Sequence, residues 1–299
     1  MGRARHAARR CREASSRADP PLALATADTE SHIAVVSPAS GRIVQRLRTI
    51  EGPRSIQGRA GDVAVCAHTK LGRISLLERD GGRVRVRRVL GGFSEPRYTV
   101  FAGRFAFVTD SGNGELATID LVRGHVVHRA AVGDLARHVT SRGQMLWVAL
   151  GSSATHIVAV DVSDPLRPRV RNRIAPRFLA HDVAVAPDGR LWITAGHEPR
   201  IALHDGPELA ADQAPQHVTF GARRAYVASG DGGSVRIHAL DGRLLRSVRV
   251  PRGSYNVQRA GRLVLTPSLG AGTLTMLDAQ GRVLREVRVA AAAHDACVL

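Results

Sequence analysis

The stretch His181-Asp182-Val183-Ala184-Val185-Ala186-Pro187-Asp188-Gly189-Arg190-Leu191-Trp192-Ile193-Thr194 decides the fold of this chain. Its two apolar runs have the composition of short β-strands, and Pro187-Asp188-Gly189-Arg190 between them is typical of a tight hairpin turn. Variants of this phrase recur along nearly the whole sequence. The phrase is therefore a repeat unit, and the number of its copies predicts the architecture.

The apolar run that ends the phrase occurs seven times. The runs begin at residues 22, 63, 105, 146, 191, 225 and 263, so that successive runs are 41, 42, 41, 45, 34 and 38 residues apart. After each run come a polar loop, a third alternating strand, a turn that often contains Gly-Arg, and a fourth strand with frequent arginines. A period of about 40 residues built only from strands is typical of β-propeller blades. The sequence predicts an all-β, seven-bladed β-propeller.

The two ends of the repeat region complement each other. The first unit lacks an inner strand, and the chain finishes with His294-Asp295-Ala296-Cys297-Val298-Leu299, which matches the opening of the repeated phrase. We expect this C-terminal strand to pair with the N-terminal blade, because that pairing closes the ring and removes an open sheet edge. In the fifth unit, residues 206–214 contain Pro207 and little strand pattern, so we expect a degenerate outer strand there.

The chain divides into a basic tail, residues 1–20, and one propeller domain, residues 21–299. The tail lacks the apolar segment of a signal peptide, so we expect it to be disordered and the protein to be cytoplasmic. A start codon assigned to the wrong position would be compatible with export instead. No later run reaches the roughly 18 apolar residues of a membrane span. Cys11, Cys66 and Cys297 are too far apart for a disulfide framework or a cysteine-based zinc site.

The composition is strongly basic, with 43 Lys+Arg against 26 Asp+Glu and a formal net charge of +17. Such a charge would suit a polyanionic partner. However, Lys70 is the only lysine, and an arginine excess of this kind is what GC-rich coding produces. The arginines of the fourth strands would also be spread around the rim instead of gathering in one groove. We therefore do not expect a nucleic-acid partner, and we expect a monomer.

The repeats resemble a known family. Phe107-Val108-Thr109-Asp110, Trp192-Ile193-Thr194-Ala195 and Tyr226-Val227-Ala228-Ser229 are similar to the aromatic-Val-Thr-Asn signature of YVTN-type β-propeller repeats. The phrase with Pro187-Asp188-Gly189-Arg190 is also similar to NHL and streptogramin-lyase-like blades. The resemblance covers residues 22–299 and implies a propeller used for binding, scaffolding or, in some relatives, catalysis. The lyase relatives are implied to use a metal held by Glu and His near the channel, and those ligands cannot be matched here blade by blade.

Polar side chains occupy the start of the inner strand in nearly every unit. Chain direction places these starts at one end of the central channel, which we call the mouth. The ligand-binding residues predicted at the mouth are Arg54, Arg97, Tyr98, Arg137, His138, His181, Asp182, His217, Tyr255, Asn256, His294 and Asp295.

Two kinds of ligand fit these residues. Arg54, Arg97 and Arg137, from three successive units, could hold a carboxylate or phosphate through bidentate hydrogen bonds. His138, Asp182, His217 and Asp295 could form the ligand set of a divalent metal ion, although no cofactor is firmly implied. The same side chains could instead bind backbone groups or channel water and tie the blades together.

No motif assigns a catalytic residue, because the chain contains neither a Ser/His/Asp order nor a helical HExxH motif. We therefore predict a non-catalytic propeller that binds a small anionic ligand or a protein loop at the channel mouth. The alternative hypothesis is a metal-dependent lyase or hydrolase that uses the His/Asp ring.

Overall fold

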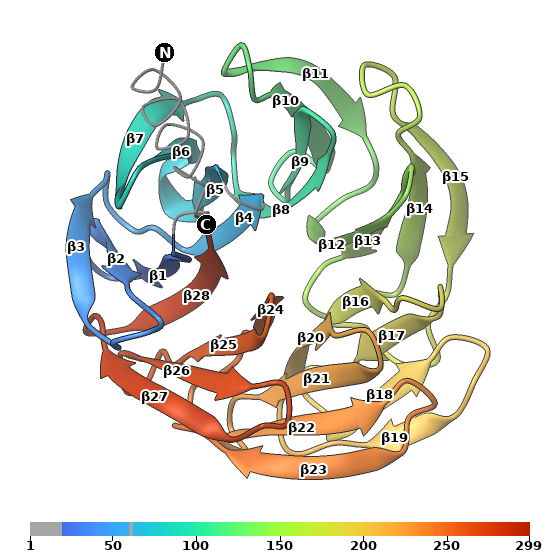
Figure 1. Cartoon of the computed structure of the whole chain (residues 1–299). Coiled ribbons are helices and arrows are strands. Elements are labelled where there is room, and N and C mark those ends of the chain that lie inside the picture. Colours follow the sequence, from blue (N-terminus) through green and yellow to red (C-terminus); the bar gives the residue numbers. More distant parts are fainter. Residues whose placement is uncertain (1–19, 60–61) are drawn as a thin grey trace, which may run out of the picture.

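The chain forms a ring of seven four-stranded antiparallel sheets, which confirms the predicted all-β, seven-bladed propeller (Figure 1). The structure is a computed structural model that describes residues 20–59 and 62–299. All of the predicted tail except Pro20 lies outside the described residues. Within them the one helix is a 3-10 turn, η1 (Thr69–Leu71). No described helix is long and apolar enough to cross a membrane.

Each sheet runs from the channel to the rim. The innermost strands are β4 (Ser55–Arg59), β8 (Pro96–Ala102), β12 (Ala136–Arg142), β16 (Asp182–Val185), β20 (Pro215–Phe220), β24 (Gln258–Ala260) and β28 (Ala293–Val298). The second strands are β1 (Ala23–Ala27), β5 (Val63–His68), β9 (Phe105–Asp110), β13 (Met145–Leu150), β17 (Leu191–Thr194), β21 (Arg224–Ser229) and β25 (Leu263–Pro267).

The outer half of each sheet contains two more strands. The third strands are β2 (His32–Val36), β6 (Arg73–Asp80), β10 (Glu115–Asp120), β14 (Ile157–Asp161), β18 (Arg200–Leu203), β22 (Ser234–Ala239) and β26 (Thr273–Asp278). The outermost strands are β3 (Ile43–Arg48), β7 (Arg83–Leu90), β11 (His125–Ala131), β15 (Arg169–Ile174), β19 (Glu208–Ala210), β23 (Leu244–Arg249) and β27 (Val283–Arg288). The short β19 is the degenerate outer strand expected in the fifth unit.

The ring is closed by β28, which pairs with β1 as predicted. Leu24 lies opposite Cys297 in the antiparallel register. Just outside the strands, Leu22 and Leu299 exchange two backbone hydrogen bonds of 2.8 and 2.9 Å. In Figure 1 the last strand, drawn in red, accordingly lies beside the first, drawn in blue. The chain ends therefore share one sheet, and the first and last blades meet without an open edge between them.

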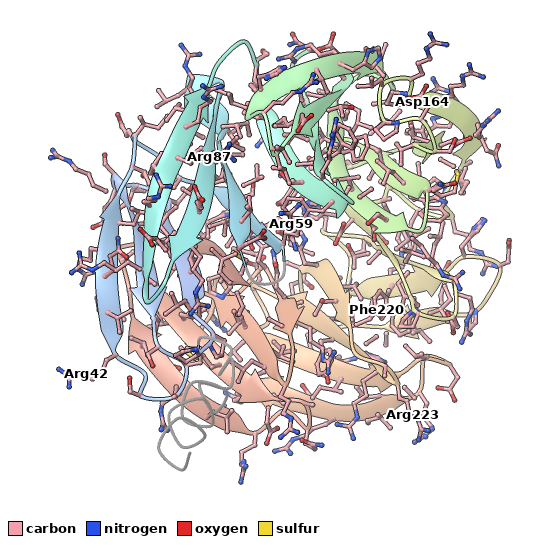
Figure 2. The ribbon with its side chains drawn as sticks, turned by 45° about the horizontal axis from the view of Figure 1, so that its top comes forward. Arg42, Arg59, Arg87, Asp164, Phe220 and Arg223 are labelled. Atoms are coloured by element: carbon pink, nitrogen blue, oxygen red, sulfur yellow. The ribbon has the colours of Figure 1, made fainter. Side chains whose placement is uncertain are left out.

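The hydrophobic core consists of layers between neighbouring sheets. Between the first two blades, for example, Leu24, Ile33 and Leu77 are fully buried in one cluster. The outermost strands instead expose many arginines, such as Arg85 and Arg249, and Figure 2 labels Arg87 on one of these strands. Charge on an exposed edge strand discourages edge-to-edge association, because a charged side chain would lose its hydration there.

Threonine hydroxyls link successive blades at the mouth. The Oγ1 atom of Thr26 donates to the carbonyl of Arg54 at 2.9 Å, and Thr109 donates to Arg137 at 2.5 Å. Thr194 donates to the carbonyl of the next blade's inner strand in the same way, at 2.8 Å. Each bond joins a second strand to the inner strand of the following blade. The recurring threonine of the repeat therefore has a structural role, which fixes the inner strands that present the mouth residues.

Candidate functional site

β-Bulges determine how the mouth residues are presented. In β8 and β12 the register shifts so that two residues, Arg97-Tyr98 and Arg137-His138, lie opposite one residue of the neighbouring strand. A shift also falls between Pro215 and His217 in β20. A bulge bends its strand and changes the direction of the side chains it contains. The same local irregularity thus turns aromatic and imidazole rings from separate blades toward the channel.

Four of the predicted residues form one cluster of rings. The His138 ring stacks on Tyr98 with centroids 4.4 Å apart, and lies 4.7 Å from His181 and 4.8 Å from His217. His181 and His217 are 6.1 Å apart and nearly perpendicular. We call His138, His181 and His217 the histidine triad. Its members come from three consecutive blades, so the packing of neighbouring blades around the channel brings them together.

The triad has the geometry of a metal-binding group. One ring nitrogen of each histidine is a candidate ligand atom, and these three nitrogens lie within 4.8 Å of one another. His138 is 1% exposed, and neither of its ring nitrogens has a hydrogen-bond partner among the described residues. A buried imidazole without partners is rare in folded proteins, because desolvating a polar group without pairing it is costly. A bound metal ion would satisfy the free lone pair.

The other two imidazoles are held by the groups behind them. The Nδ1 atom of His217 lies 3.2 Å from a carboxylate oxygen of Asp182, and Nδ1 of His181 lies 3.1 Å from the carbonyl oxygen of Ser152. In each case an N–H on Nδ1 is the donor that the oxygen requires, which leaves Nε2 as the nitrogen with a lone pair. Metal-binding histidines usually have such a partner on the nitrogen that faces away from the ion. The Tyr98 hydroxyl, 3.2 Å from Nε2 of His217, donates to that nitrogen in the metal-free protein.

Burial keeps two members of the triad, His138 and His181, uncharged. Burial, reinforced by repulsion from the neighbouring histidines, holds the pKa of His138 well below its usual value. Burial, then the charges of His217 and Arg137, lowers the pKa of His181 to about 3. Burial also raises the pKa of Tyr98, so its hydroxyl stays protonated. Neutral imidazole is the form that binds a metal, so these two histidines need not release a proton at neutral pH.

The predicted anion site is largely neutralised by the chain itself. Arg54 forms two hydrogen bonds of 3.0 and 2.8 Å with the carboxylate of Asp28. Arg97 pairs with Glu95 at 2.8 Å. Arg137 has no ion pair among the described residues, and burial lowers its pKa. One of the three predicted guanidinium groups thus remains without a carboxylate partner.

Asn256, His294 and Asp295 join blades where the ring closes. The Asn256 side chain donates to the carbonyl of His294 at 2.8 Å, and Nδ1 of His294 donates to the carbonyl of Arg54 at 3.1 Å. The Asp295 carboxylate accepts hydrogen bonds from the backbone N–H of Ile56 and Ala296, at 2.9 and 2.8 Å. Burial nevertheless raises the pKa of Asp295 to about 6. These groups have the structural role that the sequence left open for any mouth residue.

Two predicted residues remain to be placed. Tyr255 donates its hydroxyl to Asp231 at 2.5 Å, and its ring lies against Gly230, where a Cβ atom would clash with it. Asp182, predicted from the sequence as a metal ligand, lies behind His217, 3.2 Å from its Nδ1 atom. The third imidazole of the cluster is His181, which the predicted metal set did not include. That set was taken from one strand position per blade, and His181 lies one residue before that position.

A cavity of about 160 Å³ extends from the triad down the channel. Tyr98, His138 and His217 line its upper part, and Thr140, Thr219 and Gln258 line it one or two residues further along the inner strands. These lower residues are not among the strand-start residues predicted from the sequence. Each lies two residues after a mouth residue on the same strand segment. This spacing is the signal that would have identified them, because every second side chain of a strand faces the same side.

Replacing His138 by phenylalanine is expected to raise the free energy of unfolding in metal-free buffer by about 1–3 kcal/mol, because it removes a buried group with unpaired nitrogens. The larger ring has room, since His138 borders the cavity. Denaturant unfolding with a chelator present measures the change. His181→Phe is the matched control: it removes a ring that donates to Ser152 and is expected to lower the stability. A less stable H138F protein would contradict the lack of partners at His138.

The fold is shared with many solved structures, although no protein-family model and no curated protein sequence matches the chain. The apo form of AztD from Citrobacter koseri is 12% identical, with a TM-score of 0.73 over 94% of this chain and 98% of that one. A functionally unknown protein from Desulfotomaculum acetoxidans is 11% identical, with a TM-score of 0.79 over 93% and 98%. Streptogramin B lyase is 14% identical, with a TM-score of 0.64 over 79% and 82%.

These likenesses show the propeller fold alone, because all three identities are far below 25%. Without a matching family model, the resemblance to YVTN-type repeats stays a prediction from the sequence pattern. The chain is similar in fold to proteins whose names differ widely, which is expected of a scaffold that places its chemistry in a few channel residues.

Proposed function

We propose that this protein binds a divalent transition-metal ion at the mouth of its channel through the histidine triad. The observation that supports this proposal most directly is the pair of unpartnered ring nitrogens on the buried His138, beside two histidines whose outer nitrogens are already held. Imidazole nitrogen suits zinc, copper, nickel and iron, whereas magnesium and calcium prefer oxygen. Three histidine ligands would leave a further coordination position of the metal ion open for water or a small ligand.

The same observations favour a metal over the other predicted ligands. A small anion at the mouth would have to displace Asp28 and Glu95 from Arg54 and Arg97, and only Arg137 is ready to receive it. An anion bound to the open position of a metal could still interact with Arg137. The lyase or hydrolase hypothesis needs a general acid or base beside the metal. Asp295, with a pKa of about 6, is bound by backbone N–H groups, which favours a structural role.

Titration of the chelator-treated protein with Zn²⁺ in a calorimeter is expected to show one ion bound per chain. His138→Ala, His181→Ala and His217→Ala should each weaken the affinity at least 100-fold, because each removes a ligand. Asp182→Asn should weaken it about 10- to 100-fold, since Asp182 only orients His217. Saturation at 100 times the Kd should stabilise the fold by about 2.7 kcal/mol, which is visible as a higher Tm.

His125→Ala is the matched control for these variants. His125 is exposed on β11 at the rim, and its removal should leave the affinity unchanged. Tyr98→Phe tests the role of the hydroxyl: it removes a donor that competes for Nε2 of His217, so metal binding should persist or strengthen. A wild-type protein that binds no Zn²⁺, Co²⁺, Ni²⁺ or Cu²⁺, or a loss as large with H125A as with H138A, would reject the proposal.

A further inference from the structure

A second and larger cavity lies at the end of the channel opposite the mouth. It has a volume of about 750 Å³, within the range of small-molecule sites. We call it the vestibule; its lining includes Gln57, Arg79, Arg259, Arg262, Leu263 and Leu299. Gln57, Gln258 and Arg259 border both this cavity and the smaller one beneath the triad. The vestibule is therefore adjacent to the channel but shares no residue with the histidine triad.

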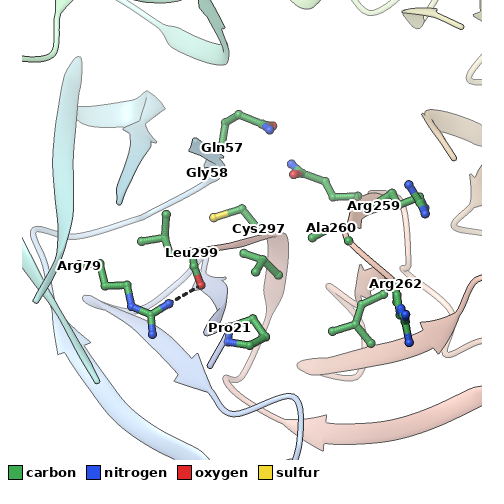
Figure 3. Close-up of a pocket in the computed structure, with 13 residues that line it drawn as sticks. Pro21, Gln57, Gly58, Arg79, Arg259, Ala260, Arg262, Cys297 and Leu299 are labelled. Atoms are coloured by element: carbon green, nitrogen blue, oxygen red, sulfur yellow. Dashed lines mark hydrogen bonds between the residues drawn. The ribbon is translucent and has the colours of Figure 1, made fainter. Parts of the chain in front are cut away.

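The lining combines an apolar wall with positive charge. Pro21, Leu263 and Val298 provide apolar surface, and no aspartate or glutamate side chain is among the lining residues. In Figure 3, Arg79 lies on one side of the cavity and bonds to Leu299, while Arg259 and Arg262 lie on the other side. Arg79 donates to the carbonyl oxygens of Leu299 and Pro20.

Arg259 and Arg262 differ from Arg54 and Arg97 at the mouth in lacking a carboxylate partner. Neither forms an ion pair with any residue in the described part of the chain, and the buried Nε of Arg259 has no hydrogen-bond partner there. Gly221 allows the guanidinium to lie close to the neighbouring blade, because a Cβ atom at that position would come within 3.1 Å of Arg259 Nε. Arg259 and Arg262 thus bring two positive charges to the lining of the cavity, where no carboxylate among the described lining residues neutralises them.

We infer that the vestibule binds a small amphipathic organic anion. Its carboxylate, sulfonate or phosphate would accept hydrogen bonds from Arg259 and Arg262, in the geometry that guanidinium groups provide for such oxygens. Its apolar body would lie against Leu263, Val298 and Pro21. The amides of Gln57 and Gln258 would face any polar group that reaches toward the channel. This site is separate from the proposed metal site and does not depend on it.

Fluorescence titration with 1-anilinonaphthalene-8-sulfonate, an amphipathic anion that brightens in apolar cavities, tests the inference on the full chain. One probe molecule is expected to bind per chain, and octanoate should displace it whereas the uncharged octanamide should not. Arg259→Gln with Arg262→Gln should weaken binding at least about tenfold. Arg42→Gln with Arg249→Gln removes the same charge from exposed positions at the rim and should leave binding unchanged.

Two further variants complete the design. Ala260→Trp keeps both arginines but fills part of the cavity, so it should also block the probe. His138→Phe in chelator should leave probe binding intact, which separates this inference from the metal proposal. The inference fails if the wild type binds no probe, if R259Q/R262Q binds as well as R42Q/R249Q, or if octanamide competes as well as octanoate. Equal Tm values for the two double variants would show that misfolding is not the cause of a difference.

Discussion

A protein that lacks residues 293–299 is expected not to fold. These residues form β28, and without it the backbone of β1 loses one row of hydrogen-bond partners in a fully buried position. Exposing a large side chain such as Leu24 costs about 1.5–3 kcal/mol. Each buried backbone group left unpaired costs about 1–3 kcal/mol more. Together these losses exceed the roughly 5–15 kcal/mol by which a typical domain is stable.

Circular dichroism and gel filtration of the truncated protein measure this loss. The matched control is a circular permutant in which Leu299 is joined to Leu22 by an Asn-Gly turn, and the chain begins at Ala293. The two residues already exchange both backbone hydrogen bonds, so a two-residue hairpin loop fits between them. The permutant should fold and melt cooperatively. A truncated protein that retained the β-sheet signal and a cooperative melt would show that ring closure is dispensable.

Acidification from pH 6.5 to 5 is expected to cost the metal-free protein about 5 kcal/mol of stability. The folded pKa values of His138, His181 and His294 lie below the unfolded value near 6.5, because burial disfavours the charged ring. Below about pH 6.5 the unfolded chain therefore binds protons that the folded protein does not bind. Each such histidine stabilises the fold fully above pH 6.5 and loses about 1.4 kcal/mol per pH unit below it.

Asp295 acts in the opposite direction. Its folded pKa of about 6 is above the unfolded value of 3.8, so the folded state binds the extra proton between these pH values. Its contribution is complete below pH 3.8 and is lost as the pH rises through 6. One such group offsets about 1.4 kcal/mol between pH 6 and 5, which is less than the three histidines together lose. The balance therefore favours unfolding in acid.

Urea unfolding at pH 7 and pH 5 in the presence of a chelator measures this dependence. His138→Phe should reduce the loss between the two pH values by about 2 kcal/mol, because it removes one of the buried histidines whose pKa is lowered most. His125→Ala is again the control and should follow the wild type, since His125 is exposed. Equal stability of the wild type at both pH values would mean that the buried rings protonate without cost.

Much of the fold could be predicted from the sequence because its signals are local. The alternation of apolar residues and the Pro187-Asp188-Gly189-Arg190 turn each act over a few residues and predicted the strands, and their recurrence about every 40 residues predicted the seven blades. The match between His294-Asp295 and the opening of the repeat predicted the closure by β28. The register shifts in β8, β12, β20 and β28 were not predicted, since the pattern of apolar residues continues past them.

The candidate site was predicted only as a set of positions. The sequence placed Tyr98, His138, His181 and His217 at the mouth, but it could not say which of them touch, because each comes from a different blade. It also gave Arg54 and Arg97 the same weight as Arg137, although Asp28 and Glu95 neutralise the first two. Ion pairs of this kind depend on the conformation of the loops between strands, which the repeat pattern does not specify.

By itself the sequence determined the number of blades, the closing strand and the list of polar side chains around the mouth. Only the tertiary structure decided that three imidazoles meet, that Asp182 supports one of them from behind, and that Arg259 and Arg262 line the vestibule at the opposite end. The reason is physical: hydrophobic periodicity is read along one strand, whereas a binding site depends on distances between side chains that ring closure and local bulges bring together.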